Sequence, residues 1–208
     1  IAARSPGITC IALPAPIASA AAIVDAWRVE PVVAWSAPEL VLVGVGVARE
    51  LRGSGAARWD EVVAGARALD VRGAVVAGES TTLDALGVAR PRLVGGAAFA
   101  PGAADHAPWL GFGDAWFALP RWTYVHDHVG ARLVLAVDAN EACDAGRWRS
   151  ELARHRVAFA TTISRTQPTI VELRRKGAAT WRAQVEAITA AIAKGAYSKV
   201  VAARTCNV

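Results

Sequence analysis

Methionine is absent from this sequence of 208 residues, including position 1, and lysine is scarce. The lysines are Lys176, Lys194 and Lys199, and the other basic residues are arginines spread along the whole chain. Because no basic block forms, the formal charge of +5 does not indicate a nucleic-acid partner. The missing first methionine, with a C-terminal apolar stretch that stops without a polar tail, predicts a truncated piece of a larger domain.

Cysteine and long apolar runs are scarce as well. The cysteines at positions 10, 143 and 206 have the spacing of neither a zinc site nor a redox pair, which favours a reduced, cytoplasmic protein. The alanine-rich stretch from Ile8 to Val24 is interrupted by prolines and is too short to span a bilayer, so we interpret it as core. A hydrophobic content of 54% with 20% charged residues excludes a disordered chain.

Alternating and β-branched apolar residues predict several strands. They cover residues 38–51, 91–102, 115–126 and 131–138, and helices are predicted at 56–69 and 141–157. A hairpin at 128–130 should join the last two strands, and Pro120 should place the first of these near a sheet edge. Without regular βαβ alternation, this order predicts an α+β fold with a mixed, largely antiparallel β-sheet and packed helices.

The sequence also predicts an apolar face for the first of these helices and a capping residue for the second. The helix at 56–69 should present one apolar face, made of Trp59, Val62, Val63, Ala66 and Leu69. Asn140 is expected to cap the helix at 141–157.

The last helix is the clearest element of the sequence. It follows a connector expected at residues 158–180, and its apolar stripe consists of Trp181, Val185, Ile188 and Ile192. Gly195 should end it as a left-handed cap, and the sequence AYSKVVAAR after the glycine predicts a strand that carries Lys199. The whole chain, 1–208, is therefore expected to be a single N-terminal part of an α+β domain, with missing neighbours for this last strand supplied from beyond residue 208.

A glycine pair offers a first candidate site. Gly44 and Gly46 follow a predicted strand, like the start of a dinucleotide-binding turn. Arg49 occupies the position of the third glycine, where close helix packing needs a residue without a side chain. Structural glycines are therefore the favoured interpretation.

Histidine and serine give two further candidates. His126 and His128 would share one side of a strand, a spacing that can bind metal, but no third ligand lies nearby in the sequence. A polar hairpin tip explains them more simply. Ser80 has neither a nucleophile elbow nor a placed histidine partner, so we do not interpret it as a hydrolase nucleophile.

Lys199 differs from these candidates. In a strand it would share a face with Val201 and Ala203, which are small enough to leave room for a ligand. A low-dielectric pocket would lower its pKa from about 10.4 and give a neutral amine, which is a general base. The alternative is a solvated charge at the end of a strand, and the residues alone leave both possibilities open.

The sequence WRAQVEAITAAIAKGAYSKVVAAR, residues 181–204, resembles the segment of chorismate-utilising enzymes in which a glycine separates a helix from a KVVLAR-like strand. Upstream, the patterns W-S-x-P at 35–38, G-G-x-x-F at 95–99 and W-x-x-F at 109–112, followed by LP at 119–120, resemble in the same order the isochorismate synthase branch. The likeness covers most of residues 35–204, and its strength lies in the ordered set. Ala202 departs from it, since the family often has leucine there.

The resemblance implies a function. Ammonia-using relatives usually have glutamine at the position of Lys199, whereas isochorismate and salicylate synthases have lysine, which points to water as the nucleophile. It implies that Mg²⁺ binds the substrate carboxylate, that Lys199 activates water for attack at C2 of chorismate, and that a glutamic acid protonates the departing C4 hydroxyl. The acid and the Mg²⁺ ligands belong to motifs beyond residue 208, so neither Glu172 nor Glu186 is assigned to them.

We therefore expect an isochorismate synthase, an isomerase of menaquinone or siderophore biosynthesis. Its expected partner is the small molecule chorismate, with no nucleic acid and no membrane, in a monomer whose fragment alone is inactive. The alternatives are a salicylate synthase, which uses the same lysine and then eliminates pyruvate, and a truncated non-catalytic α+β domain.

Overall fold

The structure is a computed structural model that describes residues 7–76, 79–106, 109–138, 141, 144–161 and 178–201. The chain divides into two compact units, Ile1–Ile163 and Ser164–Val208. The first unit contains a β-sheet with its helices, and the second contains one described helix.

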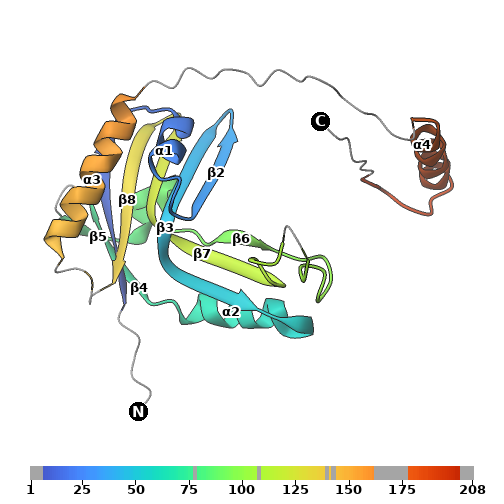
Figure 1. Ribbon diagram of the computed structural model, residues 1–208, viewed down its shortest axis with the longest axis horizontal. Coiled ribbons are helices and arrows are strands. Elements are labelled where there is room, and N and C mark those ends of the chain that lie inside the picture. The colour runs from blue at the N-terminus through green and yellow to red at the C-terminus, as the bar shows by residue number, and fades with distance from the viewer. Residues whose placement is uncertain are drawn as a thin grey trace, which may run out of the picture. The chain divides into compact units, whose positions relative to one another are not determined.

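The first unit is built on an eight-stranded sheet (Figure 1). Its strands are β1 (Ile8–Ala15), β2 (Val32–Ala37), β3 (Leu40–Gly53), β4 (Val71–Val76), β5 (Glu79–Thr81), β6 (Val94–Ala97), β7 (Ala115–Asp127) and β8 (Gly130–Asp138). Its helices are α1 (Ala20–Ala26), α2 (Arg58–Ala68) and α3 (Ala145–Ala160), with 3₁₀ turns η1 (Gly55–Ala57) and η2 (Leu83–Ala89).

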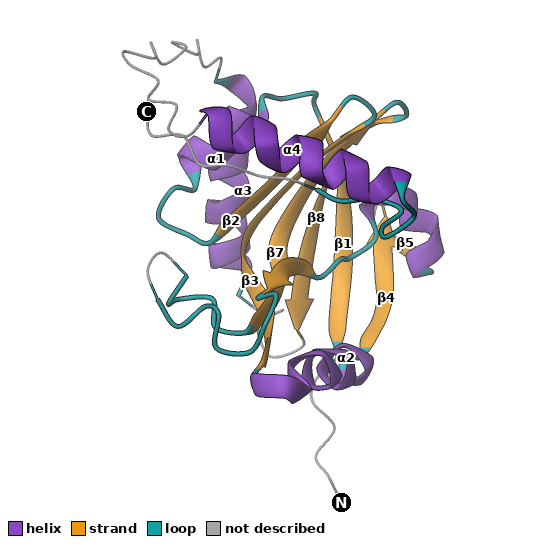
Figure 2. Ribbon diagram, turned by 90° about the vertical axis from the view of Figure 1, so that its right-hand side faces the viewer, coloured by secondary structure: helices purple, strands orange, loops and turns teal. Residues whose placement is uncertain are grey.

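The strand order is β2-β3-β7-β8-β1-β4-β5, and β6 pairs with β7 beside this path. β1 and β4 are parallel, and the other paired strands are antiparallel (Figure 2). The predicted α+β fold with a mixed, largely antiparallel sheet is therefore confirmed.

Both faces of the sheet bury apolar side chains, because alternate residues of a strand point to opposite sides. On one face Trp122 and Tyr124 of β7 pack with residues of α1 and α3, and Figure 1 shows these two helices on the same side of the sheet. On the other face Cys10 of β1 packs with η2. Ile8 and Ile23 are buried, but Ile17 between them is 71% exposed, so the alanine-rich opening of the chain, predicted to be core, is core only in part.

The predicted hairpin is confirmed as β7 and β8, but the edge position predicted for Pro120 is wrong. β7 is an interior strand that pairs with β3 along its length. On its other side β7 pairs with β6 through residues 115–118 and with β8 through residues 122–127. Pro120 lies between these two ladders, so its missing N–H interrupts neither of them.

The apolar face predicted for the helix at 56–69 is only partly buried. Val62 is buried, but Trp59 and Val63 are 50% and 43% exposed. α2 approaches β3 through Gly65, where an added Cβ would lie 2.9 Å from a methyl carbon of Leu51. This close approach turns Val62 inward and leaves Trp59 at the rim, with its ring 6.2 Å from that of Phe117.

The helix predicted at 141–157 begins later than expected. α3 starts at Ala145, and its N-cap is Asp144, whose Oδ1 accepts a hydrogen bond from Arg147 N at 3.0 Å. Asn140, the predicted cap, lies outside the described residues. Asp144 caps the helix because its side-chain oxygen is placed to accept a hydrogen bond from one of the free N–H groups of the first turn.

Asp144→Ala should lower the free energy of unfolding by about 1 kcal/mol, because this N–H then loses its acceptor. Urea denaturation followed by circular dichroism measures the change. Asp144→Asn is the matched control, since an asparagine cap should keep most of the stability. Equal losses in both variants would contradict a role for the side-chain oxygen.

In the second unit the predicted last helix is confirmed as α4 (Ala178–Ala193), and Gly195 follows with a φ of 75°. The glycine N–H donates to Ile192 O and the next N–H donates to Ala191 O, which closes the helix end. The connector predicted at 158–180 overlaps α3 and α4 at its two ends, and residues 162–177 lie outside the described part of the chain.

The strand predicted to carry Lys199 is not formed in residues 196–201. A strand needs a hydrogen-bonded neighbour, and the described residues of the second unit contain no strand that could pair with this segment. Residues 202–204, the rest of the predicted strand, lie outside the described residues.

Candidate functional site

Lys199 lies in irregular chain four residues after the Gly195 cap, and it is exposed. Within the second unit, the described residues therefore do not surround it with the low-dielectric pocket that a neutral amine requires. Its neighbour Val201 is 80% exposed, so the described residues of the second unit leave this valine uncovered. Glu186 is also exposed, on α4, and Glu172 lies outside the described residues.

The glycine pair Gly44 and Gly46, considered above as the start of a dinucleotide-binding turn, has a structural role. Gly44 and Gly46 both lie within β3, which runs on to Gly53 without a turn into a helix. An added Cβ at Gly44 would lie 2.6 Å from Pro120 Cγ, so the glycine permits close packing against β7. Arg49 donates to Asp138 Oδ2 at 2.9 Å and joins β3 to the end of β8. The structural interpretation is therefore confirmed.

Among the described residues, the histidine pair does not belong to a group that could hold a metal ion. His126 pairs with Ala131 near the end of β7, and His128 is exposed in the turn before β8. Asp127 Oδ1 accepts the N–H groups of Val129 and Gly130, which fixes the hairpin tip and lowers the pKa of this carboxyl below its usual value. Ser80 lies in β5.

No group of three or more His, Cys, Asp or Glu residues in the described part of the chain is placed to hold a metal. The described residues therefore do not fit the Mg²⁺ that the resemblance implies. Burial raises the pKa of the Cys10 thiol to about 11, so this cysteine is not a thiolate at neutral pH. None of the helices in the described ranges is long and apolar enough to cross a membrane.

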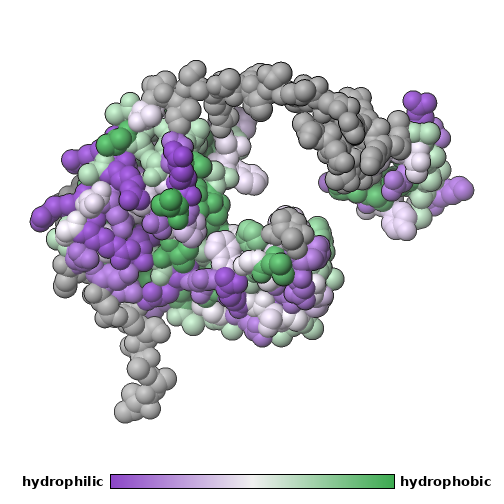
Figure 3. Space-filling model, in the orientation of Figure 1, coloured by the Kyte–Doolittle hydropathy of each residue, from purple (hydrophilic) through white to green (hydrophobic). Residues whose placement is uncertain are grey.

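Two of the motifs found in the sequence come together in space. Gly95, Gly96 and Phe99 of the G-G-x-x-F pattern and Trp109 and Phe112 of the W-x-x-F pattern line one cavity of about 420 Å³. Phe99 is fully exposed, and Trp109 and Phe112 are each about half exposed. Figure 3 shows hydrophobic surface at the β6–β7 end of the unit. The two motifs were recognised as separate patterns in the sequence, and the fold brings them together around this cavity.

The two glycines of this cavity have different roles. At Gly95 an added Cβ would lie 2.0 Å from the backbone oxygen of Trp116, so the absence of a side chain lets β6 approach β7. At Gly96 an added Cβ would meet nothing within 4 Å. Gly95 therefore closes the strand pair, whereas Gly96 keeps the cavity open.

The lining of the cavity is apolar and contains no charged side chain among the described residues. A cavity of this size and composition suits an uncharged apolar group. A dianion such as chorismate requires cationic partners, because burying an unpaired charge is strongly unfavourable. This cavity is therefore not by itself the binding site for the charged groups of chorismate.

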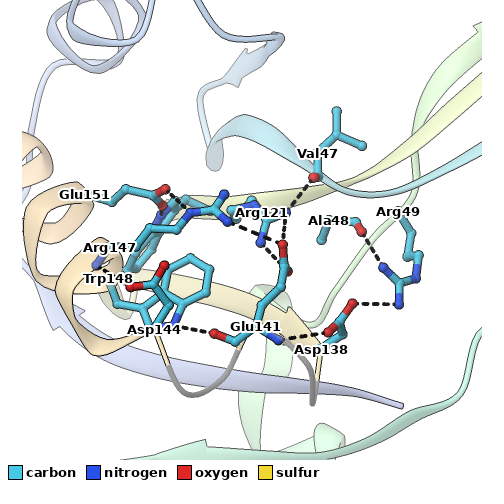
Figure 4. Close-up of polar contacts among 11 residues, drawn as sticks. Val47, Ala48, Arg49, Arg121, Asp138, Glu141, Asp144, Arg147, Trp148 and Glu151 are labelled. Carbon is cyan, nitrogen blue, oxygen red and sulfur yellow. Dashed lines mark hydrogen bonds and ion pairs between the residues drawn. The ribbon is translucent and has the colours of Figure 1, made fainter. Parts of the chain in front are cut away.

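A network of ion pairs, missed by the sequence reasoning, fastens α3 to the sheet (Figure 4). Arg121 of β7 is 11% exposed and donates to both carboxylate oxygens of Glu141, at 2.6 and 3.2 Å. Arg147 donates to Glu141 and, at 2.8 Å, to Glu151. Hydrogen bonding to Glu151 raises the pKa of Arg147 above its ordinary value.

The network is structural, because each of its charges has a partner of opposite sign. Glu151 also accepts the indole N–H of Trp122 at 2.6 Å, and Arg121 also donates to the backbone oxygen of Val47. The spacing of Arg147 and Glu151, four residues apart on one helix, was the signal available in the sequence. The link to Arg121 depends on the fold.

Comparison with known proteins assigns the chain to a family. The model of the family described as chorismate binding enzyme matches residues 12–208. No curated protein sequence matches the chain. Among solved structures, it is similar to the menaquinone-specific isochorismate synthase MenF from Escherichia coli, with 18% sequence identity and a TM-score of 0.45. The match covers 91% of this chain and 38% of that one, so the chain spans about two fifths of its length. Since the family model covers nearly the whole sequence, the chain belongs to the chorismate binding enzyme family.

Proposed function

We propose that this chain is part of an isochorismate synthase, which isomerises chorismate to isochorismate. Membership of the chorismate binding enzyme family supports chorismate as the substrate. The observation that carries the choice of reaction is the lysine at position 199, in the sequence SKVVAAR, because its resemblance to the water-using branch favours hydroxyl transfer. The proposal also includes a cytoplasmic monomer whose product feeds menaquinone or siderophore synthesis.

In the proposed reaction the neutral amine of Lys199 takes a proton from water, and the oxygen of that water forms a bond to C2 of the ring. The double bonds shift, the bond between C4 and its hydroxyl oxygen breaks, and a general acid protonates the departing oxygen to give water. One water is consumed and one is released, so the product is an isomer of the substrate. An amine base and a carboxylic acid with separated pKa values suit this exchange.

The remaining parts of the site are proposed to lie in sequence beyond residue 208. Lys199 is exposed, and the described residues provide neither an acid beside it nor a metal site. We propose that the general acid, the Mg²⁺ ligands and a strand paired with residues 196–204 come from that sequence. The same pairing would bury Lys199 and favour its neutral form.

The products of the full-length enzyme test the proposal. Incubation with chorismate and Mg²⁺, followed by chromatography, should show isochorismate and no pyruvate. Release of pyruvate with salicylate would favour the salicylate synthase alternative. No conversion by an enzyme that nevertheless binds chorismate, measured by calorimetry, would contradict the assignment of an isomerase.

A further inference from the structure

His155 on α3 is a buried titratable group that the proposed reaction does not use. Its side chain is 0% exposed, and neither ring nitrogen has a hydrogen-bond partner among the described residues. Buried polar groups in proteins are normally hydrogen-bonded, so a histidine without a partner in a core is unusual. The burial of this ring is therefore favourable only while the imidazole is uncharged.

The ring lies where two helices meet the sheet. Its centroid is 4.7 Å from the ring of Trp27, which follows α1, and 5.0 Å from the ring of Trp122 on β7. Phe159, one turn further along α3, lies 5.9 Å away. These three aromatic rings belong to the same apolar cluster, so His155 is part of the contact that holds α1 and α3 on this face.

The charged groups around the ring do not stabilise a protonated form. On α3, Arg154 carries a positive charge and lies 4.4 Å from the centre of the Trp27 ring. Glu151 is already bound by Trp122 and an arginine. At the end of α1, Asp25 is exposed and paired with Arg28.

Tyr124 on β7 is a further titratable group of this cluster. Tyr124 accepts a hydrogen bond from Ala18 N and donates to Pro16 O, and burial raises its pKa, so it stays neutral. No carboxylate among the described residues therefore pairs with the imidazole. Burial first, and the charge of Arg154 second, lower the pKa of His155 from 6.5 to about 4.

We propose that His155 is an acid-sensitive latch, which holds α1 and α3 on the sheet while its ring is neutral and releases both helices when mild acid protonates it. The direction in which stability changes with pH follows from the difference in proton binding between the folded and unfolded states. Because the pKa in the folded state is lower than in the open chain, the open state binds the proton more tightly. The contribution of His155 to the free energy of unfolding is therefore fully present above pH 6.5 and is lost as the pH is lowered towards 4.

Denaturation of the full chain tests the latch. With pKa values of 6.5 and about 4, lowering the pH from 7 to 4.5 should raise the ratio of unfolded to folded protein roughly 50-fold through this residue. His155→Phe, which keeps an aromatic ring without a titratable nitrogen, should lose this part of the pH dependence. His128→Gln, at the exposed hairpin tip, is the matched control and should behave like the natural chain. The same pH dependence in His155→Phe and the natural chain would overturn the proposal.

Hydrogen exchange at a single pH locates the opening. At pH 5, residues 20–26 and 145–160 should exchange faster in the natural chain than in His155→Phe, while β1 and β8 should exchange alike. Equal acceleration in the sheet and in the two helices would overturn a latch that acts on the helices.

If His155→Phe does not fold, nuclear magnetic resonance of the natural chain gives the answer. The ring signals of His155 should stay those of a neutral imidazole down to about pH 5, in line with the lowered pKa. A titration midpoint near 6.5 would overturn the proposal.

Discussion

Replacement of Lys199 by alanine in the full-length enzyme should lower kcat/KM for chorismate by about 100- to 10,000-fold, the range expected for loss of a positioned general base. Both kcat and kcat/KM should fall together, because the amine acts on water during the chemical step and does not hold the substrate. Stopped assays with separation of isochorismate measure both constants. Binding of chorismate to the variant, followed by calorimetry, should change little.

The matched control is Lys194→Ala. Lys194 lies five residues earlier in the same unit, directly after α4, and is also exposed. It has no part in the proposed chemistry, so its removal should leave turnover within about twofold. Unchanged turnover in Lys199→Ala would leave Lys199 as a solvated charge and contradict the proposed base.

Gly95→Ala should destabilise the first unit by about 3 kcal/mol, at the upper end of the range for overpacked sites. The new Cβ would overlap the backbone oxygen of Trp116, 2.0 Å away, and a backbone atom in a paired strand cannot move aside as a side chain can. β6 should separate from β7, and the cavity lined by Phe99 and Trp109 should lose one wall. Urea denaturation and tryptophan fluorescence measure these two effects.

Gly96→Ala is the control at the neighbouring position. Its Cβ points into open space, so the variant should be neutral or more stable by about 0.5 kcal/mol, because alanine restricts the unfolded chain. If the two substitutions destabilise equally, loss of backbone freedom explains the effect, and the close approach at Gly95 does not.

Local patterns in the sequence predicted the elements that depend on local interactions. The hairpin of β7 and β8 and the helix α4 with its cap at Gly195 lie close to their predicted ranges. Hairpin residues and a glycine cap act within a few residues, so their signals survive without knowledge of the fold.

Predictions that depend on tertiary neighbours were less successful. Pro120 indicated an edge strand, because the sequence does not show that β7 changes partners at this residue. Trp59 was placed on a buried face, although the close approach of α2 through Gly65 leaves it exposed. The strand predicted around Lys199 does not form in the described residues, since β-structure requires a partner that propensity cannot supply.

The partner change at Pro120 has a mechanical consequence. On one side of β7 no ladder bond crosses the proline, so the pairing with β6 and the pairing with β8 can open separately. The β6 end carries the cavity lined by the two motifs, whereas the β8 end belongs to the deepest core. Loss of the pairing with β6 would therefore leave the β7–β8 ladder intact, so the wall of the cavity and the buried core around Trp122 depend on separate sets of backbone hydrogen bonds.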